Sequence, residues 1–426
     1  MGNTVGIVGG GAAGMMAAIT AARNGERVTL LERNDRLGKK ILSTGNGKCN
    51  LGNERLEAEA YYTGRPDMLE DFLGRFGTED TISFFQSIGL LIKSRNGYLY
   101  PASEQAAAVL DVLRYEVKAA GVDVVTDFKA ESVERGRRSK LLQVYGKEGV
   151  YSFDRVILAC GGKAAPKTGS DGSGYRLAEQ LGHSMVPVVP ALVQLRCREE
   201  YLKSVSGVRA DAQISVWFQG KRAAQERGEL QLTEYGISGI PVFQLSRRVN
   251  YILAGAKKPA EVEVNIDFLP DYTEEDFRMQ CTGRRLLQGH RTVEEFFTGM
   301  LHKKLMLLFI KLAGLKSAEA VSGADERKLA RVYELCRCWK LHVIGSNSYD
   351  NAQVCAGGVP LDEVTESLES RLVPGVYFAG EILDVDGRCG GYNLQWAWCS
   401  GFIAGKHHGG SGVMQSRAPR GKGQVV

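Results

Sequence analysis

The chain has 426 residues, of which 44% are hydrophobic and 24% charged, an ordinary globular composition that allows two or three domains. The longest apolar run, Leu305 to Ile310, is too short to span a membrane, so we expect no membrane partner. The net charge of +5 is small for this length and does not call for a nucleic-acid partner. The nine cysteines have no regular spacing, which predicts reduced thiols in a cytoplasmic protein and no metal site.

The stretch from Thr4 to Glu32 has the pattern strand, glycine turn, helix, strand. Gly9, Gly11 and Gly14 form a G-x-G-x-x-G motif at the turn. The first glycine permits the tight turn, the second lets a pyrophosphate approach the backbone, and the third lets helix and strand touch. The helix N-terminus attracts phosphates, and Glu32 is placed to accept both ribose hydroxyls of an adenosine. The stretch therefore predicts dinucleotide binding, with a merely structural glycine turn as the alternative.

A polar, glycine-rich loop follows, made of Arg33 to Lys40 and Ser43 to Asn50. Its lysines, Thr44 and its backbone N–H groups predict a lid over the pyrophosphate. A plain solvated loop is the alternative interpretation.

The next part of the chain alternates helices and strands. Residues 65–93 have a helical pattern, and a second helix is expected from Ser103, as its cap, to Lys118. Residues 122–125 predict a strand, and residues 129–144 predict a hairpin. The run from Phe153 to Gly162 is an apolar strand that ends in two glycines, which is typical of a parallel core strand ending at a ligand.

The pattern changes after Pro190. Period-two strands without intervening helices run from Val193 to Phe268, which predicts an antiparallel sheet or a small barrel. From Asp271 the period becomes helical, and Thr273 and Thr292 each begin a capping-box-like pattern. The run Leu341 to Ile344 predicts a strand that returns to the barrel.

The end of the chain returns to the first domain. Gly375 to Glu381 is a second apolar strand that ends in glycine and an acid, and Gly391 opens a helix. A cofactor contacted from both ends of the chain suits a long, extended FAD. Glu381 is expected near the ribityl chain, and the helix that begins at Gly391 is expected to aim its positive end at the flavin N1/C2=O edge. An ordinary strand-end turn is the alternative for Gly380 and Glu381.

Several segments of the sequence resemble one known family. They are Gly6 to Gly14, Ser43 to Asn50, Phe153 to Gly162, Tyr377 to Gly387, and Gly390 to Ala397. The resemblance is to the BaiN/YhiN-like flavoproteins, also described as aminoacetone-oxidase-like or NAD(P)/FAD-dependent oxidoreductases, and it covers nearly the whole chain. It implies that the following residues lie along FAD: Ala13, Glu32, Arg33, Lys40, Gly45, Asn50, Gly380, Glu381, Gly391 and Asn393.

The predicted fold is α/β, with a glutathione-reductase-type FAD-binding Rossmann-like domain split by a β-barrel-like insert and a small helical insert. The expected boundaries are residues 1–190 for the first part of the FAD-binding domain, 191–270 for the antiparallel β insert, 271–337 for the helical insert, 338–360 for the return strands of the insert, 361–408 for the second part of the FAD-binding domain, and 409–426 for a loose tail.

The predicted cofactor site gathers the glycine turn, the loop after Glu32 and the returning segment. It comprises Gly9, Gly11, Ala12, Ala13, Gly14, Glu32, Arg33, Lys39, Lys40, Thr44, Gly45, Asn50, Gly161, Gly380, Glu381, Asp386, Gly391, Tyr392, Asn393 and Leu394. Candidates for the catalytic residues are Tyr235 and His342 as proton-transfer groups and Cys49 as a redox thiol, with structural or pocket-lining roles as the alternative.

These features predict an FAD-dependent oxidoreductase that transfers hydride between flavin N5 and a small organic substrate, and that NAD(P) or oxygen reoxidises. The sequence has no second G-x-G-x-x-G motif, so NAD(P)H is expected to visit the flavin only transiently. The alternatives are a flavin-dependent RNA-modifying enzyme and a flavin-binding protein without turnover. The sequence does not reveal the substrate or the oligomeric state.

Overall fold

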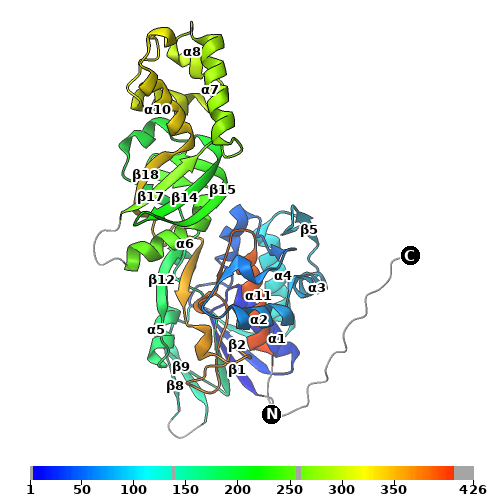
Figure 1. Cartoon of the computed structure of the whole chain (residues 1–426). Helices are drawn as coiled ribbons and strands as arrows, with labels where there is room; N and C mark the ends of the chain where they lie inside the picture. Colours follow the sequence, from blue (N-terminus) through cyan, green and yellow to red (C-terminus); the bar gives the residue numbers. More distant parts are fainter. Residues whose placement is uncertain (1–2, 137–139, 256–260, 407–426) are drawn as a thin grey trace.

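The structure, a computed structural model, describes residues 3–136, 140–255 and 261–406. The lower half of the molecule is built on a parallel sheet of five strands in the order β20-β11-β1-β2-β7 (Figure 1). These strands are β1 (Thr4–Val8), β2 (Arg27–Leu31), β7 (Asp123–Val125), β11 (Arg155–Leu158) and β20 (Val376–Phe378). Val376 of β20 lies opposite Val156 of β11, which confirms that the end of the chain joins the first sheet.

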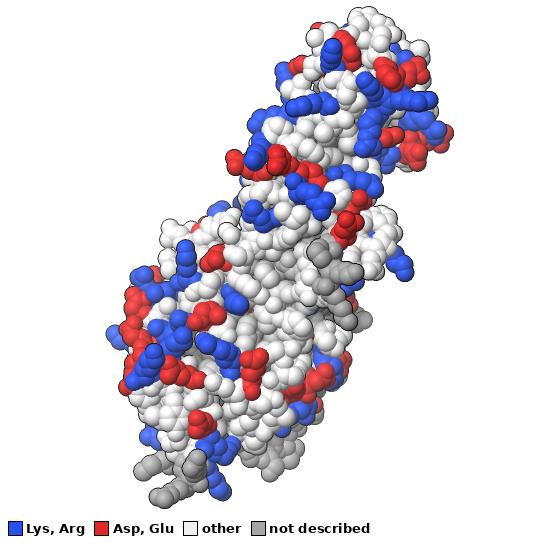
Figure 2. Space-filling view, turned by 90° about the vertical axis from the view of Figure 1, so that its left-hand side faces the viewer, with Lys and Arg blue, Asp and Glu red and all other residues white. Residues whose placement is uncertain are grey.

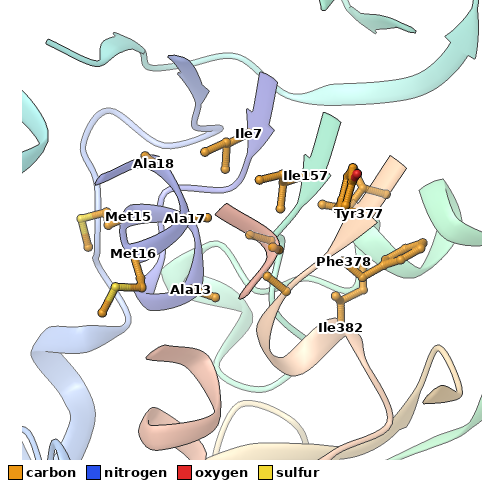
Figure 3. Close-up of a cluster of buried hydrophobic side chains, with 14 of the residues drawn as sticks. Ile7, Ala13, Met15, Met16, Ala17, Ala18, Ile157, Tyr377, Phe378 and Ile382 are labelled. Carbon is orange, nitrogen blue, oxygen red and sulfur yellow. The ribbon is translucent and has the colours of Figure 1, made fainter. Parts of the chain in front are cut away.

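Small residues allow a close contact between one helix from the first segment of the chain and one from the last described segment. Helix α1 (Ala12–Arg23) packs on α11 (Tyr392–Gly405), and a Cβ at Gly401 would lie 2.4 Å from the carbonyl oxygen of Ala13. Figure 3 shows side chains of α1 near Ile7 of β1, with Ile157 of β11 next to Ile7 and Phe378 of β20 farther along the same row. Glycine and alanine therefore allow the close helix-to-helix contact that the first and last segments share.

The helical pattern predicted over residues 65–93 is confirmed for most of its length, up to Ser87. The structure has two helices, α2 (Pro66–Arg75) and α3 (Thr78–Ser87), separated at Gly77, whose N–H donates to the Asp80 carboxylate. The predicted cap at Ser103 is wrong, because α4 (Ala106–Ala119) begins after Gln105. The hairpin of β5 (Ile92–Arg95) and β6 (Tyr98–Pro101), joined by β3 (Gly52–Asn53), covers this side of the domain.

A second, antiparallel sheet lies after β7. It contains the predicted hairpin as β8 (Ala130–Arg135) and β9 (Leu142–Gly146), and it adds β10 (Gly149–Phe153). Helix α5 (Ser173–Gln180) follows β11. The short strands β4 (Tyr61–Tyr62) and β21 (Asp386–Gly387) pair with each other.

The predicted barrel is confirmed as a closed barrel of six strands in the order β13-β16-β15-β14-β17-β18. The strands are β13 (Leu195–Cys197), β14 (Arg209–Phe218), β15 (Lys221–Thr233), β16 (Gly236–Ser238), β17 (Val262–Asp267) and β18 (Trp339–Ser346). A two-stranded ribbon of β12 (Val186–Ala191) and β19 (Val354–Gly358) connects the barrel to the lower half. Helix α6 (Ile240–Gly255), which the sequence analysis missed, packs on β15 and β12 (Figure 1).

Four helices form the far end of the molecule: α7 (Glu274–Gln288), α8 (Val293–Phe297), α9 (Lys303–Leu312) and α10 (Glu326–Arg337). The predicted caps are confirmed, since Thr273 accepts the N–H of Asp276 and Thr292 accepts the N–H of Glu295. The domain boundaries given above stay a prediction, and the predicted tail at 409–426 lies outside the described residues.

Positive and negative side chains are mixed over the face shown in Figure 2, with a broad uncharged surface across its middle. Of the helices that the structure describes, none is both long and apolar enough to cross a lipid bilayer.

Candidate functional site

A large cavity lies where the parallel strands β1, β2, β11 and β20 end. Counted out to its open mouth, it holds about 1250 Å³ of space. Segments from both ends of the chain line it, among them Gly9, Glu32, Gly161, Gly380 and Asn393. The carboxyl ends of parallel strands are where such folds bind ligands.

The three glycines of the turn have different surroundings. A Cβ at Gly9, whose φ is +106°, would lie 2.5 Å from the Ala159 carbonyl oxygen, and a Cβ at Gly14 would lie 1.8 Å from the carbonyl oxygen of Gly9. At Gly11, no heavy atom of the described residues comes within 4 Å of the added Cβ. The fold therefore requires glycine at the first and third positions, whereas glycine at the second keeps space open toward the cavity.

Glu32 stands at the end of β2 with its carboxylate buried in the cavity wall; the residue is 6% exposed. The N–H of Gly10 donates to Oε2 over 2.7 Å, and the backbone N–H and the side-chain amide of Asn34 donate to Oε1 over 2.8 and 2.7 Å. These donors fix both oxygens and keep the carboxylate stable without a cation. It is therefore a preorganised acceptor for hydroxyl groups of a ligand.

Glu381 ties three parts of the chain together at the cavity. Lys40 Nζ lies 2.7 Å from Glu381 Oε2, and the N–H of Cys355 donates to Oε1 over 2.7 Å. Lys40 belongs to the loop after β2, and Cys355 belongs to the ribbon strand β19. The Glu381 carboxylate in the cavity wall therefore accepts one hydrogen bond from the loop after β2 and another from ribbon strand β19.

Helix α11 begins beside the cavity. Its N-cap is Gly391, with φ +95°, where a Cβ would lie 2.5 Å from the carbonyl oxygen of Gly52. Asn393 and Leu394 in the first turn line the cavity, and the amide of Asn393 makes 2.9 Å hydrogen bonds with both the N–H and the C=O of Gly387. The free N–H groups of a helix start supply a positive potential there.

Most of the predicted cofactor residues line the cavity: Gly9, Gly11, Ala12, Ala13, Glu32, Arg33, Lys39, Lys40, Thr44, Gly161, Gly380, Glu381, Asn393 and Leu394. The remaining ones, all within the described part of the chain, lie outside this lining: Gly14, Gly45, Asn50, Asp386, Gly391 and Tyr392. In this second group, Asp386 pairs with Arg247 and Tyr392 packs edge-on against Tyr61. Contact of either group with FAD stays a prediction.

The three catalytic candidates lie outside the lining of this cavity and have other partners. Cys49 is fully buried, and burial raises the pKa of its thiol to about 12, so that it is protonated at neutral pH. His342 Nδ1 lies 2.7 Å from Glu199 Oε1 in the barrel, and the hydroxyl of Tyr235 accepts a hydrogen bond from Asn347 over 3.1 Å. Their geometry adds no support for a role in catalysis.

Sequence reasoning missed several lining residues. Phe128 and Lys129 come from the segment that leads into β8, and Gln353 and Val354 come from the start of β19. Strand pairing far along the chain brings these segments to the cavity, and no local sequence pattern marks them. Asn34 was also missed, although an asparagine two residues after Glu32 is a recognisable hydrogen-bond partner for its carboxylate.

These residues fit an FAD molecule. An open cradle at Gly11, a buried acid with fixed oxygens at Glu32, and a helix start at Asn393 are distributed along one cavity. They match in turn a pyrophosphate, an adenosine ribose and an electron-rich ring edge.

Comparison with known proteins shows the family of the chain. The family model described as "HI0933-like protein Rossmann domain" matches residues 3–407. The chain belongs to this family. A 3-dehydro-bile acid delta(4,6)-reductase of Clostridium scindens is 43% identical over 407 residues, which cover 95% of this chain and 98% of that protein. A ribosomal RNA dihydrouridine synthase of Haemophilus influenzae is 30% identical over 93% of this chain and 96% of that protein, and one of Escherichia coli is 29% identical over 93% and 95%.

Membership of the HI0933-like family confirms the resemblance inferred from the motifs. It also confirms the predicted fold class, a Rossmann-type α/β domain that here carries a closed six-stranded barrel as an insert. The chain is an enzyme of the oxidoreductase class, a flavoprotein with an FAD-type cofactor.

Proposed function

We propose that this enzyme reduces a carbon–carbon double bond conjugated to a ketone in a flat, polycyclic small molecule. The observation that carries the proposal is the 43% identity, over 95% of the chain, to a reductase named for a 3-dehydro-bile acid. The 3-oxo group and the neighbouring double bonds of such a substrate form a conjugated enone. The uracil ring reduced by a dihydrouridine synthase likewise has its double bond conjugated to a carbonyl. The common chemistry therefore supports conjugate reduction, and the higher identity favours the small molecule.

The cofactor we propose is FAD, bound along the cavity between the two chain ends. Glu32 would hold the adenosine ribose, the turn at Gly11 and the N-terminus of α1 would hold the pyrophosphate, and the first turn of α11 would face the flavin. When bound, FAD supplies hydride transfer through N5 and exchanges electrons with NAD(P)H, NAD(P) or oxygen.

The chain's own residues orient the cofactor and shield it from water. The Lys40–Glu381 pair fixes the loop after β2 against the returning segment. Asn393 fixes the loop at Gly387, so that the start of α11 keeps its position. Val354 and Val385 place apolar side chains in the wall, where they exclude water from the reacting end.

A second candidate substrate is a uridine in ribosomal RNA, because two relatives at 30% and 29% identity are named ribosomal RNA dihydrouridine synthases. RNA binding requires a basic surface that neutralises phosphates. On the face in Figure 2 opposite charges are mixed, so this face offers no such basic surface.

The test is a substrate panel offered to the purified holoenzyme after anaerobic reduction. The panel contains a steroid 4-en-3-one, the corresponding 4,6-dien-3-one, the saturated 3-ketone and unmodified ribosomal RNA, and the flavin spectrum reports reoxidation. We expect rapid reoxidation by the enone or the dienone, with formation of the product that carries two more hydrogens, and none by the saturated ketone. Reoxidation by the RNA alone, with dihydrouridine formed, would overturn the proposal in favour of the second candidate. A parallel assay with NADH and NADPH identifies the electron donor.

A further inference from the structure

The insert contributes a short stretch to the wall of the cofactor cavity. Among the described residues that line the cavity, only Gln353 and Val354 come from the chain between Leu177 and Ala379, which contains the barrel, the four far helices and the ribbon. Gln353 directly precedes ribbon strand β19, and Val354 begins it. The cofactor residues predicted from the sequence all belong to the segments before and after the insert, so these two residues are the contacts that the insert itself offers to a bound molecule.

This stretch lies at the end of the cavity beside the start of α11. The N–H of Cys355, two residues after Gln353, donates to Glu381, which follows β20. Strands β1 and β11 separate β20 from β2, so the ends of β20 and β2, where Glu381 and Glu32 stand, lie three strand spacings or roughly 14 Å apart. Strand β19 also packs against β21, which packs against α11. Gln353 is therefore at the end that would receive the flavin ring, and not at the end that would receive the ribose.

At this end of the cavity, the side-chain amide of Gln353 is available to a ligand, whereas its polar neighbours are engaged. Lys40 is paired with Glu381, Thr44 donates to a backbone carbonyl of its own loop, and the amide of Asn393 is bonded to the loop before α11. The amide of Gln353 has no hydrogen bond to any described residue, and the residue is exposed. Its two N–H donors carry no net charge and do not titrate, so they are present at every ordinary pH.

We propose that the amide of Gln353 donates a hydrogen bond to the carbonyl oxygen of the conjugated substrate and so selects ketones. This inference rests on the proposed function. A neutral donor beside the apolar side chain of Val354 suits a ligand that carries one carbonyl on an apolar body.

The same hydrogen bond strengthens during the reduction. As hydride from the reduced flavin adds to the far carbon of the conjugated double bond, electron density moves onto the carbonyl oxygen, and the amide N–H stabilises that charge. The amide keeps its own hydrogens, and the near carbon takes its hydrogen as a proton from water. Gln353 therefore favours substrates with a ketone beside the double bond, both in binding and in the reaction.

The experiment measures equilibrium binding to the oxidised holoenzyme and needs no turnover. Two ligands are compared, a steroid 4-en-3-one and the same 4-ene without the 3-oxygen, with binding read from the change in flavin absorbance. Gln353→Met keeps an unbranched side chain without the amide. We expect its affinity for the ketone to fall roughly three- to tenfold, the range of one neutral hydrogen bond, and its affinity for the deoxygenated ligand to stay unchanged.

A second variant separates donor from acceptor. Gln353→Glu keeps the length of the side chain and its acceptor oxygens, but as a carboxylate it has no donor. We expect it to lose the preference for the ketone as Gln353→Met does. The matched control is Gln86→Met, since Gln86 is exposed on α3 and lies outside the cavity lining, and this variant should keep the affinities of the parent. Flavin content and thermal midpoint establish that each variant is folded.

The outcomes separate this role of Gln353 from the proposed function. An unchanged ketone affinity in Gln353→Met, an equal loss for both ligands, or a ketone preference retained in Gln353→Glu overturns the inference and leaves the proposed function standing. Weaker FAD binding in Gln353→Met with an unchanged ketone preference also overturns it, because the amide would then serve the cofactor. A parent enzyme that binds neither ligand overturns the proposed function itself.

Discussion

The glycine turn offers a test that separates ligand approach from fold stability. Gly11 has φ −81° and ψ −164°, which alanine adopts without strain, and no heavy atom of the described chain lies within 4 Å of the Cβ it would gain. In the FAD-free protein we therefore expect Gly11→Ala to change the free energy of unfolding by less than about 1 kcal/mol. Because Gly11 lines the cavity, the same methyl group would occupy the space that the pyrophosphate needs.

The expected loss of FAD affinity follows from the contacts that the methyl group prevents. A hydrogen bond from a backbone N–H to a charged group contributes about 1.5–3 kcal/mol. Since about 1.4 kcal/mol corresponds to a factor of ten in the dissociation constant, Gly11→Ala should bind FAD roughly 10- to 150-fold more weakly. The assay strips FAD from both proteins, titrates it back and follows flavin fluorescence.

Gly14→Ala is the matched control. Its Cβ would lie 1.8 Å from the carbonyl oxygen of Gly9, a backbone atom that cannot turn away, so that the turn itself must move. We expect this variant to lower the thermal midpoint of the FAD-free protein as well as FAD affinity. The reasoning fails if Gly11→Ala binds FAD as tightly as the parent, or if it destabilises the FAD-free protein as much as Gly14→Ala does.

Three further variants or conditions have expected outcomes. Glu32→Gln leaves an amide unable to accept from both Gly10 and Asn34, so FAD affinity should fall at least about tenfold while FMN, which has no adenosine ribose, is unaffected in a competition titration. Burial raises the pKa of Asp386 from 3.8 to about 7, so its ionised form is disfavoured in the folded state. The free energy of unfolding should therefore fall as the pH rises from about 4 to about 7, and the thermal midpoint of Asp386→Asn should fall less over that range. Cys49 should resist alkylation in the native protein while exposed Cys338 reacts, as mass spectrometry of modified peptides can show.

The parts of the site that the sequence predicted are those with local signals. The glycine spacing around Gly9 and the acid at Glu32 follow from one strand, one turn and one helix. The pairing of β20 with the first sheet could be predicted because its apolar strand, which ends in Gly380 and Glu381, has the same pattern as β11, which ends in two glycines. Each of these signals is contained within a few residues of the chain.

Helix α6 could not be predicted in the same way. Its polar residues include Arg247 and Asn250, whose partners are Asp386 and the carbonyl oxygen of Pro190 in other parts of the molecule. These side chains interrupt the apolar stripe by which a helix is recognised, because the helix is in contact with the barrel on one side and the ribbon on the other. The contacts of α6 with Asp386 and with strand β12 were not predicted for the same reason.

The insert is structurally coupled to the cofactor cavity through a small number of contacts. Glu381 receives Lys40 from the first segment and the N–H of Cys355 from the ribbon that leaves the barrel, and Arg247 of α6 reaches Asp386 of the returning segment. A cavity wall that depends on these links cannot be completed by residues before the insert alone. Moving α6 would separate Arg247 from a carboxylate that is 2% exposed, and an unpaired buried charge is costly. The Arg247–Asp386 pair therefore stabilises one position of the insert against the segment that returns to the cavity.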